Sequence, residues 1–171
     1  MIFLTVGTQF PFDRLTRSVD EAVDGSGLGE DIFGQIGDGS YQPRNFQTVP
    51  FLKKSEYDRC MREATGIISH AGIGTIATAL EYGKPLLVMP RLKKCGEVVN
   101  DHQLAIARKF EQMGYLLAAY NPRDLPAAME KLKTFAPRRR ETQADLVANR
   151  IAQFLREHRP KTYSQTSVKS L

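Results

Sequence analysis

The residues with the clearest chemistry lie in the middle of the chain. Gly72 and Gly74 follow an apolar run at residues 66–69, and Thr75 opens a segment with helical spacing. A glycine turn between a strand and a helix leaves backbone N–H groups free at the positive helix end, which favours an anion. His70 directly precedes this turn and could bond a phosphate oxygen or be a satisfied structural histidine. We therefore predict a phosphate-bearing ligand here.

A polar cluster follows the next apolar run, residues 86–89. Asp101, His102 and Gln103 combine acceptors with imidazole and amide donors, which suits sugar hydroxyls. Asp101 could equally be a helix N-cap with a solvated first turn. Gly7 and Thr8 end the first apolar run and supply a second N–H-rich turn, or an ordinary strand-to-helix connection. Open α/β sheets bind ligands beyond the carboxyl ends of their strands, so we expect all three segments at one edge.

The glycine turn superficially matches a dinucleotide fingerprint, because Gly72-x-Gly74-x-x-Ala77 has the required spacing. That fingerprint also needs an acidic residue at the end of the following strand, to hold a ribose hydroxyl. Here the strand ends in Met-Pro-Arg91, and the next carboxylate is Glu97. An oxidoreductase with a nicotinamide cofactor is therefore not expected.

The composition is that of a soluble globular protein with anionic partners. The 171 residues are 42% hydrophobic and carry a net charge of +5. Cys60 and Cys95 stand far apart, which favours neither a metal site nor a disulfide framework. No apolar run is long enough to span a membrane and no signal peptide is evident, so we expect a cytoplasmic chain. The basic run at residues 138–140 is a solvated surface or attracts anionic lipid. Nucleic-acid binding is not expected, because aromatic residues are not interleaved with it.

Strand-like and helix-like segments alternate along the chain. This alternation predicts one Rossmann-like α/β domain with a parallel sheet over residues 1–158, followed by a polar, flexible tail at 159–171. A last helix with an apolar stripe precedes the tail and either packs on the sheet or docks on a partner. The expected strands are residues 2–6, 31–36, 45–49, 66–69, 86–89 and 115–118.

Four motifs in order resemble glycosyltransferase family 28. They are MIFLTVGT at residues 1–8, SHAGIGT at 69–75, EYGKPL at 81–86 and NDHQL at 100–104. More narrowly, the chain resembles the stand-alone C-terminal half of that family. Such subunits occur in bacterial exopolysaccharide glucuronosyltransferases and in the soluble part of the dolichol-pathway N-acetylglucosamine transferase.

The resemblance implies the C-terminal half of a GT-B enzyme, which holds a UDP-sugar donor without a metal or other cofactor. Gly7, Thr8 and the turn containing Gly72, Gly74 and Thr75 would face the diphosphate, with His70 beside them. Asp101, His102 and Gln103 would reach the sugar, and Arg91 is counted among the donor-binding residues. Many relatives place a glutamate on the ribose where this chain has Thr78, so ribose recognition is weaker or uses Glu81 or a partner residue.

The resemblance also implies what the chain does. A complete GT-B enzyme has an acceptor-binding domain, for which this chain has no residues. We therefore expect the cytoplasmic, donor-binding subunit of an inverting two-component glycosyltransferase. A membrane-anchored partner subunit would bring the lipid-linked acceptor and the general base, and would recruit the chain to the inner face of the membrane. The alternative is a non-catalytic nucleotide-binding or regulatory module.

Overall fold

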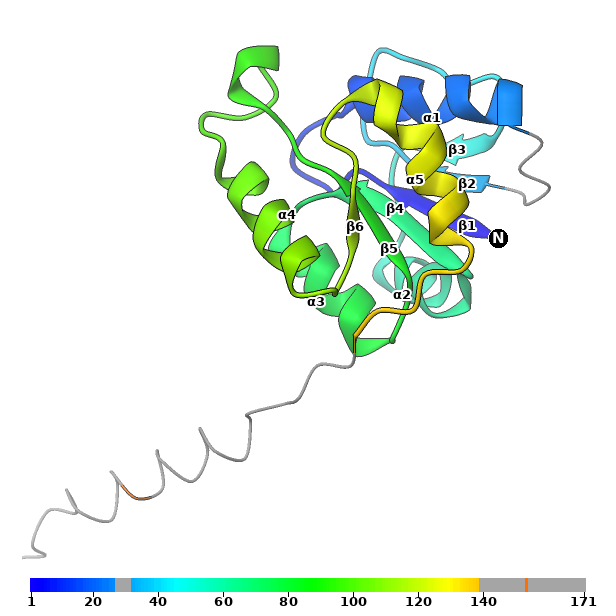
Figure 1. Ribbon diagram of the computed structural model, residues 1–171. Coiled ribbons are helices and arrows are strands. Elements are labelled where there is room, and N and C mark those ends of the chain that lie inside the picture. Colours follow the sequence, from blue (N-terminus) through cyan, green and yellow to red (C-terminus); the bar gives the residue numbers. More distant parts are fainter. Residues whose placement is uncertain (27–31, 139–152, 154–171) are drawn as a thin grey trace, which may run out of the picture. The chain divides into compact units, whose positions relative to one another are not determined.

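The computed structural model describes residues 1–26, 32–138 and Gln153 (Figure 1). Residues 1–26 and 32–138 belong to one compact unit. The predicted last helix and the polar tail therefore lie outside the described residues, apart from Gln153. In the described part, strands and helices alternate as β1 (Ile2–Thr5), α1 (Asp13–Ser26), β2 (Ile32–Gln35), β3 (Gln47–Val49), α2 (Lys54–Glu63), β4 (Gly66–His70), α3 (Ile73–Glu81), β5 (Leu86–Met89), α4 (His102–Gln112), β6 (Leu117–Ala118) and α5 (Leu125–Leu132).

The six strands form one parallel sheet in the order β3-β2-β1-β4-β5-β6. The predicted α/β fold with a parallel sheet is thereby confirmed. Strand β1 lies between β2 and β4, so the direction of winding reverses between β1 and β4. Such a reversal opens a crevice beyond the carboxyl ends of the two strands, where ligands bind in open α/β sheets. The register aligns Thr5 of β1 with Ser69 of β4, which places Gly7 and His70 together at the carboxyl ends of these two strands.

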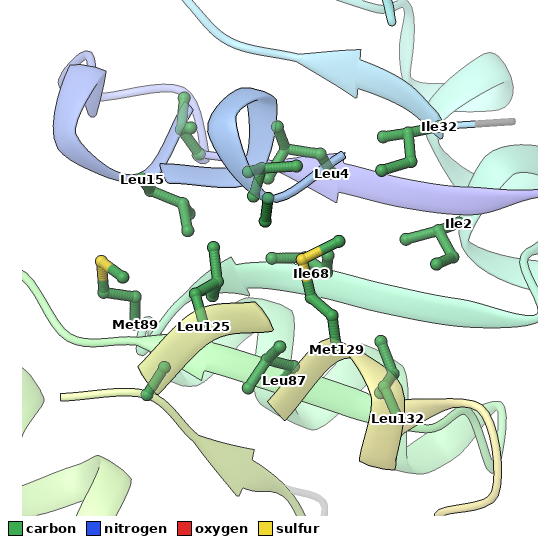
Figure 2. Close-up of a cluster of buried hydrophobic side chains, with 14 of the residues drawn as sticks. Ile2, Leu4, Leu15, Ile32, Ile68, Leu87, Met89, Leu125, Met129 and Leu132 are labelled. Atoms are coloured by element: carbon green, nitrogen blue, oxygen red, sulfur yellow. The ribbon is translucent and has the colours of Figure 1, made fainter. Parts of the chain in front are cut away.

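Helices cover both faces of the sheet, because the strands carry apolar side chains on both sides. Helices α1 and α5 cover one face, and Figure 2 shows Leu4 and Ile68 of the sheet beside Leu15 and Met129 of these helices. Helices α2, α3 and α4 cover the other face, over a core built around Phe3 of β1. The successive strand residues Leu4 and Phe3 thus point to opposite faces, as the pleat requires.

The predicted elements are present with shifted ends. Residues 86–89 form the expected strand, whereas the strand expected at 115–118 covers only Leu117–Ala118. Serine is a common N-cap, but the N-cap of α2 is Lys53, two residues before Ser55. The Glu56 carboxylate accepts a bond from the Lys53 backbone N–H at 3.1 Å, which holds the helix start at this position. Among the described residues, no helix is both long and apolar enough to cross a lipid bilayer.

Candidate functional site

Two turns meet beyond the carboxyl ends of β1 and β4, and we call them the switch-point turns: residues 7–9 after β1 and residues 70–74 from the end of β4. Gly7 has a φ of +80°, a conformation that strongly favours glycine. Its carbonyl accepts a bond from the Gln35 amide at 3.0 Å, and its N–H donates to the Thr5 hydroxyl at 3.3 Å. The first turn is therefore held from β1 and β2 together.

The imidazole ring of His70 lies between the two switch-point turns. A Cβ atom added to Gly7 would lie 2.9 Å from His70 Cε1, and one added to Gly72 would lie 2.1 Å from His70 Nε2. Both distances are below van der Waals contact, so either residue can only be glycine while the ring keeps this position. Because Gly7 and Gly72 have no side chain, the backbone of both turns can approach the His70 ring closely.

The proton on His70 can be assigned from its neighbours. Ser69 Oγ donates its only hydrogen to the Thr5 carbonyl at 2.6 Å and lies 3.1 Å from His70 Nδ1. Ser69 must therefore accept from that nitrogen, which places the ring proton on Nδ1 and leaves Nε2 with a lone pair. Burial, and next the positive charge of Arg91, lower the pKa of His70 to about 4, although the Thr5 carbonyl opposes this shift.

His70 is therefore neutral near pH 7 and cannot donate from Nε2 in that state. An anion bound beside the ring would raise its pKa, and the protonated ring would then donate to the anion. The sequence-based expectation of a bond to phosphate stays a prediction, and it now requires uptake of a proton.

Arg91 lies at the same edge, two residues beyond β5, and only 3% of its surface is exposed. Its Nη2 atom donates to the Val6 carbonyl at 2.9 Å and to the Phe10 carbonyl at 2.5 Å. The ring of Phe12 lies 4.9 Å from the guanidinium carbon. The structure thus directs this side chain into the protein, beneath the first switch-point turn.

The segment beyond Arg91, residues 92–101, forms a more exposed part of the edge, which we call the β5 loop. Arg14 of α1 donates to both oxygens of Glu97 at 2.7 and 2.8 Å, and the second oxygen also accepts from the Leu92 N–H at 2.8 Å. The carboxylate of Asp101 accepts from the Lys93 N–H at 2.8 Å. The loop is therefore shaped by its own acidic side chains and by α1.

The predicted polar cluster divides into exposed and buried members. Asp101 occupies the N-cap position of α4, but its carboxylate bonds Lys93 and does not cap the helix. His102 is exposed and its ring bonds the side chain of Asn100. Gln103 is only 5% exposed, and its Oε1 atom accepts from the Arg91 N–H at 3.1 Å. That bond joins the start of α4 to the end of β5.

The remaining predicted residues are spread along α3 and the first turn. Thr8 is exposed, whereas Thr75 is buried in the first turn of α3. The Thr78 hydroxyl donates to the Gly74 carbonyl at 3.0 Å. Glu81 is the last residue of α3, about 12 Å along the axis from the turn that begins the helix. The structure therefore does not bring Glu81 to the carboxyl edge, because α3 runs back toward the start of β5.

Sequence reasoning missed three residues that shape this edge. Gln35 and Ser69 hold Gly7 and His70, and Arg14 holds the β5 loop through Glu97. A polar residue within each of two apolar strands was the available signal for Gln35 and Ser69, whereas nothing in the local sequence pairs Arg14 with Glu97. Within the described ranges, no three His, Cys, Asp or Glu side chains cluster so that they could hold a metal ion.

Comparison with known proteins agrees with this geometry. The glycosyltransferase family 28 C-terminal domain matches residues 1–157. The human "UDP-N-acetylglucosamine transferase subunit ALG13" is 35% identical over 125 residues, which are 67% of this chain and 10% of the human protein. The chain thus spans only a small part of that relative.

Two solved structures share the fold. The solution structure of ALG13 has a TM-score of 0.56 at 19% identity and covers 88% of this chain and 93% of its own. MurG of Acinetobacter baumannii has a TM-score of 0.60 at 21% identity, covering 78% of this chain and 42% of its own. The chain belongs to glycosyltransferase family 28, and residues 1–157 are its C-terminal domain.

Proposed function

We propose that this domain is the donor-binding part of an inverting two-component glycosyltransferase. It binds a UDP-sugar at the carboxyl edge of the sheet and transfers the sugar to a lipid-linked saccharide held by a membrane-anchored partner subunit. The observation that carries the proposal is the pair of glycine turns closed around His70 at the switch point of the sheet. The printed name of the human relative, a transferase subunit acting with UDP-N-acetylglucosamine, supports both the donor class and the need for a second subunit.

The switch-point turns suit the diphosphate. Backbone N–H groups at the start of α3 provide a positive helix end, and Arg91 adds a full charge behind the turn after β1. In the transition state, negative charge develops on the departing UDP, where preorganised donors are most effective. The β5 loop, with Asp101 and His102 exposed, would face the sugar.

Exposed apolar side chains at the same edge support a protein partner. Phe10, Phe51, Ile73 and Val99 are 57%, 49%, 56% and 85% exposed, and they follow β1, β3, β4 and β5 respectively. Large apolar groups gathered around a polar site indicate an interaction surface.

The partner would also supply the general base that deprotonates the acceptor hydroxyl. His70 is the half-buried imidazole of the site, but its Nε2 lies beside Gly72, in the turn that this proposal assigns to the diphosphate. A base must reach the acceptor, which a second subunit would bring. In this proposal the protein is cytoplasmic, is recruited to the membrane by its partner and acts in the assembly of an exopolysaccharide or another glycan.

Nuclear magnetic resonance titration of the full chain tests the donor-binding step. UDP, UDP-glucuronic acid and UDP-N-acetylglucosamine should shift the amide signals of the switch-point turns, with affinities near the millimolar range because half a cleft covers only part of the ligand, about −4 kcal/mol. NAD should bind more weakly. Tighter binding of NAD than of UDP would contradict the proposal.

Transfer assays test the two-component part. The full chain should transfer sugar from one of the two UDP-sugars only when the membrane-anchored partner is added. Binding of UDP together with no transfer under any pairing would favour a nucleotide-binding regulatory module instead.

A further inference from the structure

The structure assigns Arg91 a positioning role: its buried guanidinium holds the turn after β1 in shape and supplies a fixed positive charge beneath it, without touching the ligand. This inference rests on the proposed function insofar as the ligand is a diphosphate. It departs from the sequence-based expectation that Arg91 is itself a donor-binding side chain.

The hydrogen bonds of Arg91 bracket the turn. Its Nη2 atom has two hydrogens and donates to the carbonyls of Val6 and Phe10, on either side of residues 7–9. Gly7 inside that bracket has a positive φ and lies against His70. Because a single nitrogen joins both ends of the turn, its position fixes the distance between them.

The charge of Arg91 has no carboxylate bonded to it among the described residues. Glu97 is the nearest acidic influence on its pKa, yet that carboxylate is bonded to Arg14 and to the Leu92 N–H. Arg91 Nε has no hydrogen-bond partner in the described structure. A buried cation bonded only to neutral carbonyls is costly, and an anion bound at the surface above it would offset that cost.

A purely structural role for Arg91 predicts different behaviour from a structural and electrostatic one. If Arg91 acts only through its hydrogen bonds, any side chain that donates to the two carbonyls should replace it in part. If its charge also acts on the site, its removal should change the pKa of His70 and the affinity for an anion. His70 reports this directly, because burial, the charge of Arg91 and the Thr5 carbonyl are the influences on its pKa.

The test uses the full chain with Arg91→Met, Arg91→Gln and Arg91→Lys, and Lys93→Met as the control. Lys93 is an exposed cation on the β5 loop. The titration of His70 is followed by nuclear magnetic resonance without ligand. We expect the pKa of His70 to rise by roughly 0.5 to 1 in the Met and Gln variants, because a nearby like charge is removed. The Lys variant and the Lys93 control should titrate like the wild type.

Hydrogen exchange of the Val6 and Gly7 amides, which donate to the Gln35 carbonyl and the Thr5 hydroxyl, reports the shape of the turn separately from the charge. Exchange should be faster in all three Arg91 variants, including Arg91→Lys, because an ammonium does not reproduce the guanidinium geometry. Titration with inorganic pyrophosphate should show affinity about 5- to 10-fold lower for the Met and Gln variants, because a partly screened positive charge near the anion is removed. Lys93→Met should lower it less.

The outcomes separate this inference from the proposed function. An unchanged His70 titration in folded Arg91→Gln overturns the electrostatic role, and unchanged amide exchange in all variants overturns the positioning role. If Arg91→Met fails to fold, the Gln and Lys variants still decide both points. Failure of wild-type protein to bind UDP contradicts the proposed function, whereas the ligand-free titration of His70 still decides the role of Arg91.

Discussion

The switch-point turns and the β5 loop lie at the same edge of the sheet but are held in different ways. The switch-point turns enclose the half-buried ring of His70 between two glycines, with Arg91 beneath. The β5 loop is largely exposed and is held by two carboxylates, the exposed Asp101 bonding the Lys93 N–H and the part-buried Glu97 bonding Arg14. One part of the candidate site is therefore fixed by close packing, and the other by hydrogen bonds that compete with water.

This difference indicates that the two parts of the proposed donor site have different roles. Closely packed groups have little freedom, so the part assigned to the diphosphate is preorganised before the ligand arrives. Exposed hydrogen bonds contribute little net stability, so the part assigned to the sugar can adjust when a partner covers it. Substitutions should consequently be more damaging to folding in the first part than in the second.

Acidification should change the free energy of unfolding more than any substitution considered below, because His70 becomes protonated in the unfolded chain. Its pKa is about 4 in the folded protein and 6.5 in the unfolded chain, so between these values the unfolded chain binds more protons. Its contribution to stability is complete above pH 6.5 and is lost as the pH falls toward 4, by up to about 3 kcal/mol. Urea unfolding between pH 7.5 and 4.5 measures this loss.

His70→Gln is the matched control for that experiment, because glutamine does not titrate. The stability of this variant should change less over the same pH range.

Asp20 affects stability in a different pH range. Burial raises its pKa, but bonds from Tyr41, Asn45 and Arg44 lower it below 3.8 overall. Its contribution is therefore lost only at still lower pH. An equal pH slope for wild type and His70→Gln would show that His70 is not held neutral by the fold.

Two glycines of one turn provide the next test. A Cβ atom at Gly72 would lie 2.1 Å from His70 Nε2, whereas one at Gly74 would have no neighbour within 4 Å. Gly72→Ala should displace the ring, cost about 2 kcal/mol of stability and lower UDP affinity. Gly74→Ala lies within α3 and should be neutral or stabilising, by about 0.5 to 1 kcal/mol. Thermal unfolding of both variants compares them, and equal destabilisation would refute the assigned packing.

Much of the fold could be predicted from the sequence, because apolar runs alternate with helical periodicity. The run at residues 86–89 forms β5 as expected, and the glycine turn after β4 begins α3. The order of the strands could not be read in the same way. It depends on the packing of helices that are distant in the sequence, and only that order puts Gly7 beside His70.

The site was less predictable than the fold. Residue type indicated that His70 and the glycines belong together, and their proximity in the structure agrees with this. The sequence does not indicate in which direction a side chain points. Arg91 follows a strand, where a cation is usually exposed, yet it is buried with its guanidinium against the ring of Phe12. For Gln103 the sequence predicts a contact with the sugar, but nothing in the sequence indicates that its amide oxygen accepts a bond from the backbone of Arg91.

Gln103→Ala should lower the free energy of unfolding by an intermediate amount, since Gln103 connects the start of α4 to the end of β5. Its Oε1 atom satisfies the buried Arg91 N–H, and removal would leave that donor without its partner at a cost of about 1 kcal/mol. The sequence-based prediction that Gln103 reads the sugar requires a further loss of transfer with UDP binding retained. Urea unfolding and transfer assays with the partner measure the two effects, and an unchanged stability would contradict the buried bond.

His102→Ala should have the smallest effect on folding. The side chain, on the first residue of α4, is exposed and contacts Asn100 of the β5 loop, so the free energy of unfolding should change by less than about 0.5 kcal/mol. If the exposed part of the edge faces the sugar, transfer in the presence of the partner should fall while UDP affinity stays the same. Thermal unfolding, UDP titration and transfer assays on one preparation give all three values. A loss of stability as large as that of Gly72→Ala would mean that the β5 loop is packed as tightly as the switch-point turns, and the contrast between the two regions would then be wrong.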